Sequence, residues 1–125
     1  MAEERIDLDE GELTVREMRA LLETWPADVT FADADNIIRF YTGRHRIFDR
    51  EPENIGTSVI ACHSPGIQGD VERLITELRD GWRDEATFLE EKGGRFVSVR
   101  YIPVRDGEEY LGILEVAQWV DEVGI

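Results

Sequence analysis

The last third of the chain is β-rich and is divided by two short glycine turns. The β-like runs are Asp84–Glu90, Arg95–Arg105 and Tyr110–Val120. Lys92–Gly94 and Asp106–Glu108 separate them, and each contains glycine where a hairpin needs a positive φ angle. The sequence therefore predicts three consecutive antiparallel strands.

A second β-hairpin is predicted nearer the N-terminus. Two short β-like runs, Val29–Ala32 and Ile37–Tyr41, flank the cluster of turn formers Asp33–Asn36. The stretch that follows, Arg44–Pro65, shows no sustained periodicity. We expect short helical turns there, including one near Glu51–Asn54.

A connector helix is predicted between the hairpin and the last three strands. Apolar residues return with helical period on one side of this segment, namely Ile67, Val71, Leu74, Ile75 and Leu78. Gly81 is placed as a C-terminal cap. We expect this helix to lie on a sheet and to turn its charged side towards solvent.

An amphipathic helix is predicted over residues 13–26, after a flexible acidic arm over residues 1–12. Thr14 and Glu17 have the spacing of a capping box, and Pro26 is placed to end the helix. One face carries four apolar side chains: Met18, Leu21, Leu22 and Trp25. We expect this face to pack across a homodimer interface or onto the open face of the sheet.

The net charge excludes some classes of partner. The chain has 28 acidic and 14 basic residues, for a formal net charge of -14, so a nucleic acid or an anionic membrane surface would be repelled. Lys92 is the only lysine. Strong acidity with arginine in place of lysine resembles the proteins of halophilic archaea, whose carboxylates keep the surface hydrated in high salt.

The single cysteine and the N-terminal residues indicate the compartment. Cys62 alone forms no internal disulfide, which fits a reducing environment. The first ten residues lack the basic and apolar parts of a signal peptide. We therefore expect a cytoplasmic protein.

The order of the predicted elements, together with several short motifs, resembles the PAS domain family. Residues 28–65 resemble its strand, acidic turn, second strand and helical region ending in a hydrophobic-Gly pair, here Ile55-Gly56. Residues 111–116 resemble the end of its final strand. Cys62–Pro65 resembles the CHPP step of a PAS subgroup found beside hemerythrin-like domains.

The resemblance implies an α+β fold. Residues 27–121 would form the PAS domain, a five-stranded antiparallel sheet with helices on one face that enclose a pocket. Because PAS folds carry many different ligands and outputs, the fold alone does not imply a particular ligand.

Five residues are candidates for contact with a ligand in such a pocket. Cys62 and His63 could ligate a metal or haem iron, or His63 could anchor its loop by hydrogen bonds while Cys62 packs as a small buried side chain. Phe48 and Tyr101 are aromatic residues suited to a cavity wall, and Gln118 could hydrogen-bond a ring-shaped ligand. If any residue binds a metal, it is His63.

These observations favour a sensory and signalling module that performs no catalysis, since the chain contains no phosphate loop, GxSxG elbow or HExxH pair. It would bind a small ligand or dimerise, and relay the signal to a protein partner in cis or in trans. One alternative is a ligand-free interaction adaptor. Another is a haem or metal sensor that uses His63 and Cys62, although the sequence requires no cofactor.

Overall fold

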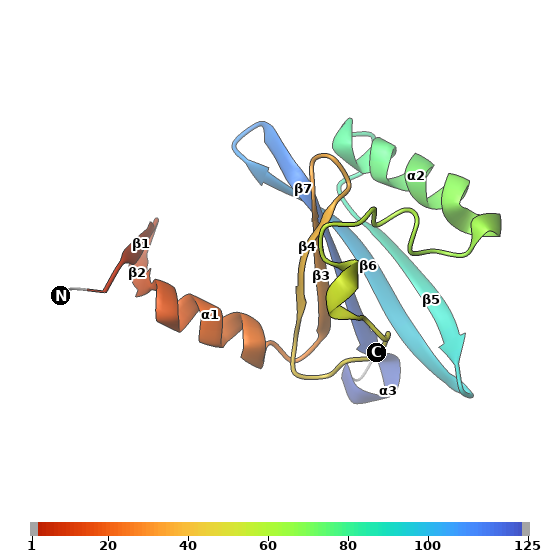
Figure 1. The fold of residues 1–125 in the computed structure, drawn as a ribbon, viewed down its shortest axis with the longest axis horizontal. Coiled ribbons are helices and arrows are strands. Elements are labelled where there is room, and N and C mark those ends of the chain that lie inside the picture. Colours follow the sequence, from red (N-terminus) through yellow and green to blue (C-terminus); the bar gives the residue numbers. More distant parts are fainter. Residues whose placement is uncertain (1–2, 124–125) are drawn as a thin grey trace.

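Five antiparallel strands form one sheet, as the sequence predicts (Figure 1). The computed structural model describes residues 3–123. Along the chain, the elements are β1 (Arg5–Leu8), β2 (Gly11–Thr14), α1 (Val15–Thr24), β3 (Asp28–Asp33), β4 (Ile38–Thr42), the 3-10 turn η1 (Pro52–Asn54), α2 (Pro65–Arg79), β5 (Ala86–Lys92), β6 (Arg95–Asp106), β7 (Glu109–Trp119) and α3 (Val120–Val123). The strands of the sheet lie in the order β4-β3-β7-β6-β5.

The centre of the sheet joins the first hairpin to the last strand. Asp28 lies opposite Ala117 and Asp33 lies opposite Gly112, so β3 and β7 pair along their whole shared length. Gly112 is required by this close approach, because a Cβ at that position would collide with the carbonyl oxygen of Ala32. The two predicted β regions thus form a single sheet.

The hydrophobic core lies between α2 and one face of the sheet. The helix buries Val71, Leu74, Ile75 and Leu78, four of the five residues predicted for its inner side. Ile67 remains 45% exposed, because it lies in the first turn, at the open end of the helix. The connecting segment between β4 and α2 contributes Ile47 and Val59 to the same core.

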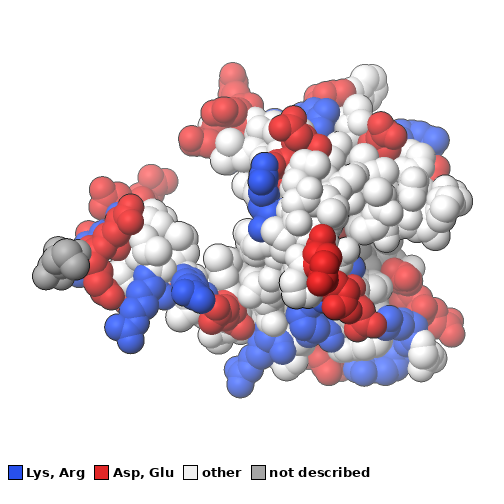
Figure 2. Space-filling model, viewed as in Figure 1, with Lys and Arg blue, Asp and Glu red and all other residues white. Residues whose placement is uncertain are grey.

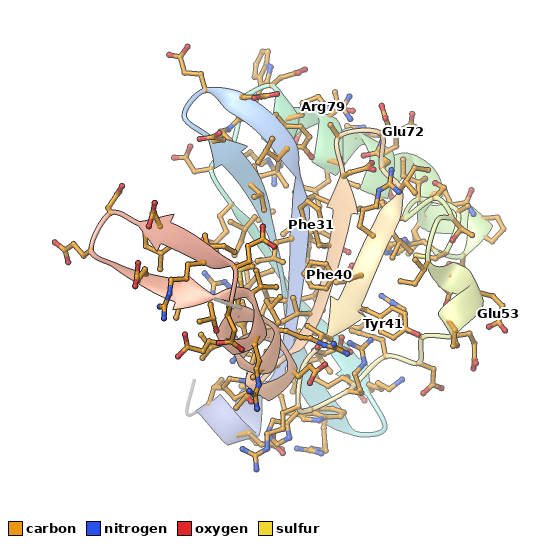
Figure 3. The ribbon with its side chains drawn as sticks, turned by 60° about the vertical axis from the view of Figure 1, so that its left-hand side comes forward. Phe31, Phe40, Tyr41, Glu53, Glu72 and Arg79 are labelled. Carbon is orange, nitrogen blue, oxygen red and sulfur yellow. The ribbon has the colours of Figure 1, made fainter. Side chains whose placement is uncertain are left out.

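The opposite face of the sheet carries a second, smaller apolar group. Val29 and Val116 are buried there, and Phe40, Ile102 and Leu114 pack against them with partial exposure. Phe31 and Phe40 lie next to each other on this face (Figure 3), and they stack with 5.8 Å between ring centroids.

Residues 1–12 were expected to be a flexible arm, and the structure instead has a β-hairpin there. Strands β1 and β2 pair antiparallel from Arg5–Thr14 to Leu8–Gly11, and Arg5 bonds Glu12 across the strands at 2.9 Å. Residues 1 and 2 lie outside the described part of the chain. The hairpin leads directly into α1.

Helix α1 begins with the predicted capping box. The amide of Glu17 donates to Thr14 Oγ1 at 3.0 Å, and the amide of Thr14 donates to Glu17 Oε1 at 2.8 Å. The helix spans Val15–Thr24, shorter than the expected 13–26, because Leu13 belongs to β2 and Trp25 is the C-cap. Hairpin β1–β2 and the adjacent part of α1 stand apart from the rest of the molecule (Figures 1 and 2).

The end of the described chain also differs from the expectation. The last strand was predicted to continue to Val120, but β7 ends at Trp119 and a short helix, α3, follows. Arg95 holds this helix by two hydrogen bonds to Asp121, at 2.7 and 2.9 Å, and its guanidinium stacks on Trp119. Across residues 3–123, every helix is too short or too polar to cross a lipid bilayer.

Candidate functional site

A cavity of about 440 Å³ lies between α2, the connecting segment and strands β5–β7. Its walls are largely apolar and aromatic, formed by Phe48, Val71, Leu74, Phe88, Val99 and Tyr101. This volume falls in the range of small-molecule sites, which combine apolar walls with a few polar groups.

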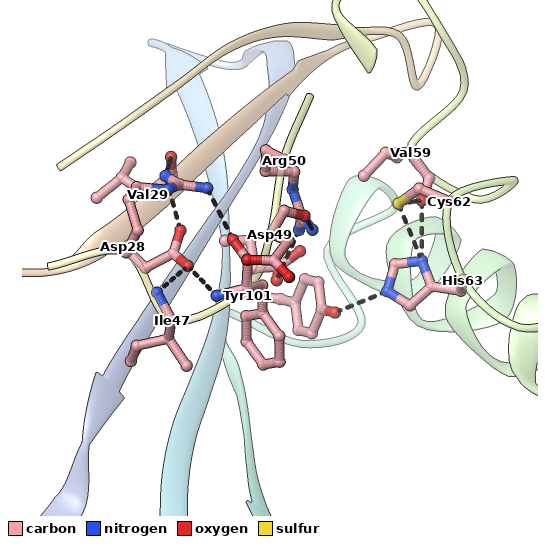
Figure 4. A network of polar contacts seen from close by, with 12 residues as sticks. Asp28, Val29, Ile47, Asp49, Arg50, Val59, Cys62, His63 and Tyr101 are labelled. Carbon is pink, nitrogen blue, oxygen red and sulfur yellow. Dashed lines mark hydrogen bonds and ion pairs between the residues drawn. The ribbon is translucent and has the colours of Figure 1, made fainter. Parts of the chain in front are cut away.

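Asp28 anchors the connecting segment over the sheet. Its side chain is only 3% exposed at the start of β3, and its Oδ2 accepts hydrogen bonds from the amides of Ile47 at 2.9 Å and Phe48 at 2.8 Å (Figure 4). Arg46 pairs with the other oxygen at 2.9 Å. Asp28 therefore sets the position of Phe48, one of the cavity walls.

One residue of the basic group Arg44–Arg46, namely Arg46, has a structural role. Besides pairing with Asp28, Arg46 donates to the carbonyl of Thr42 at 2.9 Å. The sequence left open whether this group holds an anion or is solvated. In the structure Arg46 is committed to contacts within the chain.

The cavity contains a buried pair of opposite charges, Glu115 and Arg50, whose polar atoms are only partly satisfied by hydrogen bonds. Glu115 is 6% exposed on β7, and its Oε1 lies 3.7 Å from Nη2 of Arg50, beyond hydrogen-bond distance. Within residues 3–123, Glu115 Oε2 and Arg50 Nε are buried and have no hydrogen-bond partner. Burial raises the pKa of the Glu115 carboxyl, and the positive charge of Arg50 opposes this in part.

Cys62, His63 and Tyr101 meet at one wall of the cavity (Figure 4), and Tyr101 is the cross-strand partner of Glu115. His63 Nδ1 lies 2.9 Å from the carbonyl oxygen of Val59, and His63 Nε2 lies 3.5 Å from the Tyr101 hydroxyl. With its proton on Nδ1, the imidazole donates to Val59 and accepts from Tyr101. His63 therefore anchors its loop, which was one of the two expected roles.

Cys62 differs from the small buried side chain that was considered for it. The thiol is exposed, donates to the carbonyl of Val59 at 2.8 Å and lies 3.5 Å from His63 Nδ1. The hydrogen bond that the Cys62 sulfur accepts from His63 is the first cause that raises the pKa of His63, and partial burial acts against it. Burial raises the pKa of the Tyr101 hydroxyl.

Four of the five predicted ligand residues border this one cavity: Phe48, Cys62, His63 and Tyr101. Gln118 lies elsewhere, beside a smaller cavity of about 180 Å³ near α3. Side chains alternate along a strand, so Gln118 faces away from the side that Glu115 faces. It is therefore separate from the main cavity.

Sequence reasoning missed Glu115, Arg50 and the role of Asp28. The signal for Glu115 was a carboxylate in the middle of the apolar run Ile113–Ala117. A charge inside such a run indicates either an exposed strand face or a buried functional group. Arg50 and the structural role of Asp28 had no comparable signal, since both lie among many other charges.

The geometry of His63 bears on the metal and haem interpretation. Among residues 3–123, no three His, Cys, Asp or Glu side chains are grouped so that they could hold a metal ion. His63 Nε2, the nitrogen nearer the cavity, already faces the Tyr101 hydroxyl. For this nitrogen to hold a metal or haem iron, Tyr101 or His63 would have to move.

Comparison with known proteins gives a family match over most of the chain. A family model described as PAS domain matches residues 18–121. A search of curated proteins found no match.

Several solved structures share the fold. The crystal structure of a C-terminal domain from Streptococcus mutans has a TM-score of 0.87 at 28% identity, covering 97% of this chain and 96% of that one. The PAS domain of Bordetella pertussis BvgS has a TM-score of 0.55 at 18% identity, covering 88% and 87%. A sensory box sensor histidine kinase from Vibrio cholerae has a TM-score of 0.58 at 12% identity, covering 82% and 89%.

Proposed function

Since this chain belongs to the PAS domain family, we propose that it is a sensory module that binds a small ligand in the 440 Å³ cavity. The observation that carries the proposal is the unmatched pair Glu115–Arg50 among apolar and aromatic walls. A buried polar atom without a partner costs about 1–3 kcal/mol, and a ligand that hydrogen-bonds it would recover part of this cost. The proposed role involves no catalytic step.

The contacts of Asp28 support a route from the cavity to α1. Asp28 holds the Phe48 amide, and it follows the end of α1 by only four residues. A ligand that displaces Phe48 would therefore pull on the junction between β3 and α1. The proposed output is a change in the position of α1, read by a signalling protein in the same chain or in a separate one.

A direct test uses protein purified from its native host. We expect native mass spectrometry to show added mass that is lost on denaturation, together with an absorbance spectrum that classifies the ligand. A Soret band would favour the haem alternative through His63, and a ring absorption would favour an organic ligand. Protein without added mass, in which small molecules also cause no NMR shifts at the cavity, would contradict ligand binding and leave the ligand-free adaptor.

We also propose that α1 mediates homodimer formation. The helix has no buried residue, and its apolar stripe stays open, with Leu21 56% and Trp25 41% exposed. Met18 and Leu22 on the same stripe are only partly buried. A second copy can cover this stripe in a two-fold arrangement, since each copy then supplies the same surface.

Substitution on the two sides of α1 tests the dimer. Leu22→Asp places a charge in the stripe and should lower the mass measured by light scattering to that of one chain. Ala20→Asp makes the same charge change about 200° around the helix and should leave the mass of the dimer unchanged. Equal masses for both variants and the unmodified protein would contradict the proposal.

Two features support our proposal that the protein works in a salt-rich, reducing cytoplasm. The net charge of -14 with a single lysine fits a salt-rich cytoplasm, and the exposed free thiol of Cys62 fits a reducing one. The Cys62–Pro65 step supports placement in the PAS subgroup found beside hemerythrin-like domains.

A further inference from the structure

The position of Glu115 specifies the chemistry of a ligand more closely than the fold does. Its side chain is 8% exposed and borders the cavity, while Arg50 reaches it only at 3.7 Å. Rotation about the terminal side-chain bond exchanges the two carboxyl oxygens, so either one can meet a ligand. The group that completes this site must donate a hydrogen bond to a carboxyl oxygen.

The other charged groups around the cavity also favour a positively charged ligand. Asp70 and Glu90 join Glu115 as lining carboxylates, against the single guanidinium of Arg50. His63 is engaged by the Val59 carbonyl and the Tyr101 hydroxyl. Asp70 is 72% exposed and lies 3.5 Å from Arg73, and Glu90 is also exposed. Glu115 is therefore the buried carboxylate that an entering anion would meet beside Arg50.

Aromatic side chains supply the remaining contacts. Phe48, Phe88 and Tyr101 border the same cavity, and Phe88 meets Tyr101 edge to face with 6.2 Å between ring centroids. Ring faces attract ammonium groups, and the ammonium of Lys92 already lies 5.4 Å from the Phe48 centroid. These walls therefore suit both an apolar body and a cationic head.

We propose that the cavity binds a small organic cation, an amine or ammonium compound with a ring or short apolar chain, whose positive group pairs with Glu115. This inference rests on the proposed ligand-binding function and specifies the class of ligand. The apolar body packs against Phe48, Phe88 and Tyr101. A neighbouring positive charge favours the ionised carboxyl, so a bound cation offsets the burial that raises the pKa of Glu115.

A matched set of benzyl compounds tests the charge preference. Benzylamine, benzyl alcohol and benzoate have similar size but carry a positive, zero and negative charge. Each is titrated into ¹⁵N-labelled protein at one fixed KCl concentration, and dissociation constants are taken from the amide shifts of residues around the cavity. We expect benzylamine to bind at least about tenfold more tightly than the other two, as a charge-assisted hydrogen bond requires.

Substitution of Glu115 assigns the preference to one side chain. In Glu115→Gln the advantage of benzylamine over benzyl alcohol should fall below about threefold, while benzyl alcohol binds as before. Glu91→Gln removes an exposed carboxylate of the same strand as Glu90 but outside the cavity, and it should keep the full preference. A preference that survives in Glu115→Gln would overturn the assignment.

A second variant, Phe88→Leu, tests the aromatic contacts and does not depend on whether Glu115→Gln folds. Phe88 is half-exposed, so Phe88→Leu should leave the fold intact. It should weaken benzyltrimethylammonium several-fold more than benzyl alcohol, because only the cation uses the ring face. Equal weakening of both compounds would contradict the aromatic part of the inference.

The outcomes separate this inference from the proposed function. Binding of benzyl alcohol or benzoate as tightly as benzylamine would overturn the cation preference and keep the cavity as a ligand site. Absence of shifts at the cavity with every compound would overturn both.

Discussion

Replacing Glu115 by glutamine should make the protein more stable, and increasingly so as the pH rises. Glutamine has nearly the same shape but stays neutral, so it removes a buried negative charge and keeps the hydrogen-bonding atoms. The charged or titratable groups that face this position are Arg50, His63, Asp28, Glu90 and Tyr101.

The magnitude follows from the balance between attraction and burial. At 3.7 Å and an effective dielectric constant of about 20, the attraction to Arg50 is worth about 4.5 kcal/mol. Taking one carboxylate out of water costs several kcal/mol, and a distance of 3.7 Å supplies no hydrogen bond to offset it. The pKa of Glu115 is raised, which means that burial outweighs the attraction and that folding shifts the carboxyl towards its neutral form relative to the unfolded chain.

The direction of the pH dependence follows from this raised pKa. The contribution of Glu115 to stability is fully present below its unfolded pKa of about 4.3, and it is lost as the pH rises through the folded pKa. Glutamine does not titrate, so it avoids this loss. The variant should therefore gain about 1.4 kcal/mol over the unmodified protein between pH 4 and pH 8 for each unit by which the folded pKa is raised.

Urea unfolding between pH 4 and pH 8, followed by tryptophan fluorescence, measures this difference. Glu91→Gln is the control, since loss of an exposed carboxylate should change stability by less than about 0.5 kcal/mol at each pH. The reasoning fails if Glu115→Gln differs from the unmodified protein by a constant amount, or if it becomes relatively less stable at high pH. Either result would mean that Arg50 compensates the buried charge.

Three further predictions concern the anchor, the central strands and the surface charge. Asp28→Ala should cost about 3 kcal/mol in urea unfolding because two amides and Arg46 lose their acceptor, whereas the exposed Asp35→Ala should cost under about 1 kcal/mol. Equal losses would contradict the anchoring role. Gly112→Ala should cost at least about 2 kcal/mol through collision with β3, while Gly66→Ala in α2, with open space around it, should stabilise by up to about 1 kcal/mol. A tolerated Gly112→Ala would mean that β3 and β7 lie further apart. Raising KCl from 0.1 to 2 M should raise Tm by several degrees, because salt screens a net charge of -14, and an unchanged Tm would refute this.

The elements that the sequence predicted well have strong periodicity or turn chemistry. Helix α2 was predicted from the spacing of its apolar residues, and the turns around Gly93 and Gly107 divided the last three strands correctly. These local patterns match the structure because apolar residues with this spacing all face the core. Ile67 was the exception, since it lies in the first turn of α2 and borders the cavity, where it stays 45% exposed.

Hairpin β1–β2 could not be predicted in the same way. Its strands have four residues each, and five of these eight residues are exposed. Arg5–Leu8 alternates polar and apolar residues, but over only four residues, and Gly11–Thr14 has a single apolar residue, so the pattern is too short to indicate a strand. The segment therefore looked like a loose polar arm.

The candidate site was only partly predictable, because its aromatic residues and its charges carry different signals. Phe48 and Tyr101 were found as large apolar side chains that a core or a cavity must accommodate. The partnership of Glu115 with Arg50 depends on segments 65 residues apart that meet only in the folded chain. No local spacing encodes such a pair.

The antiparallel pairing of β3 with β7 brings the two junctions of the sheet domain close together. Asp28, just after the Trp25–Ala27 link from α1, lies opposite Ala117, two residues before β7 ends. A folded unit whose entry and exit points are neighbours can be inserted into an exposed loop of another protein with little distortion of either. Residues 27–119 are thus suited to insertion into a loop of a fluorescent protein to make a biosensor. Ligand binding would then change the distance between the two ends of the insert and, with it, the fluorescence.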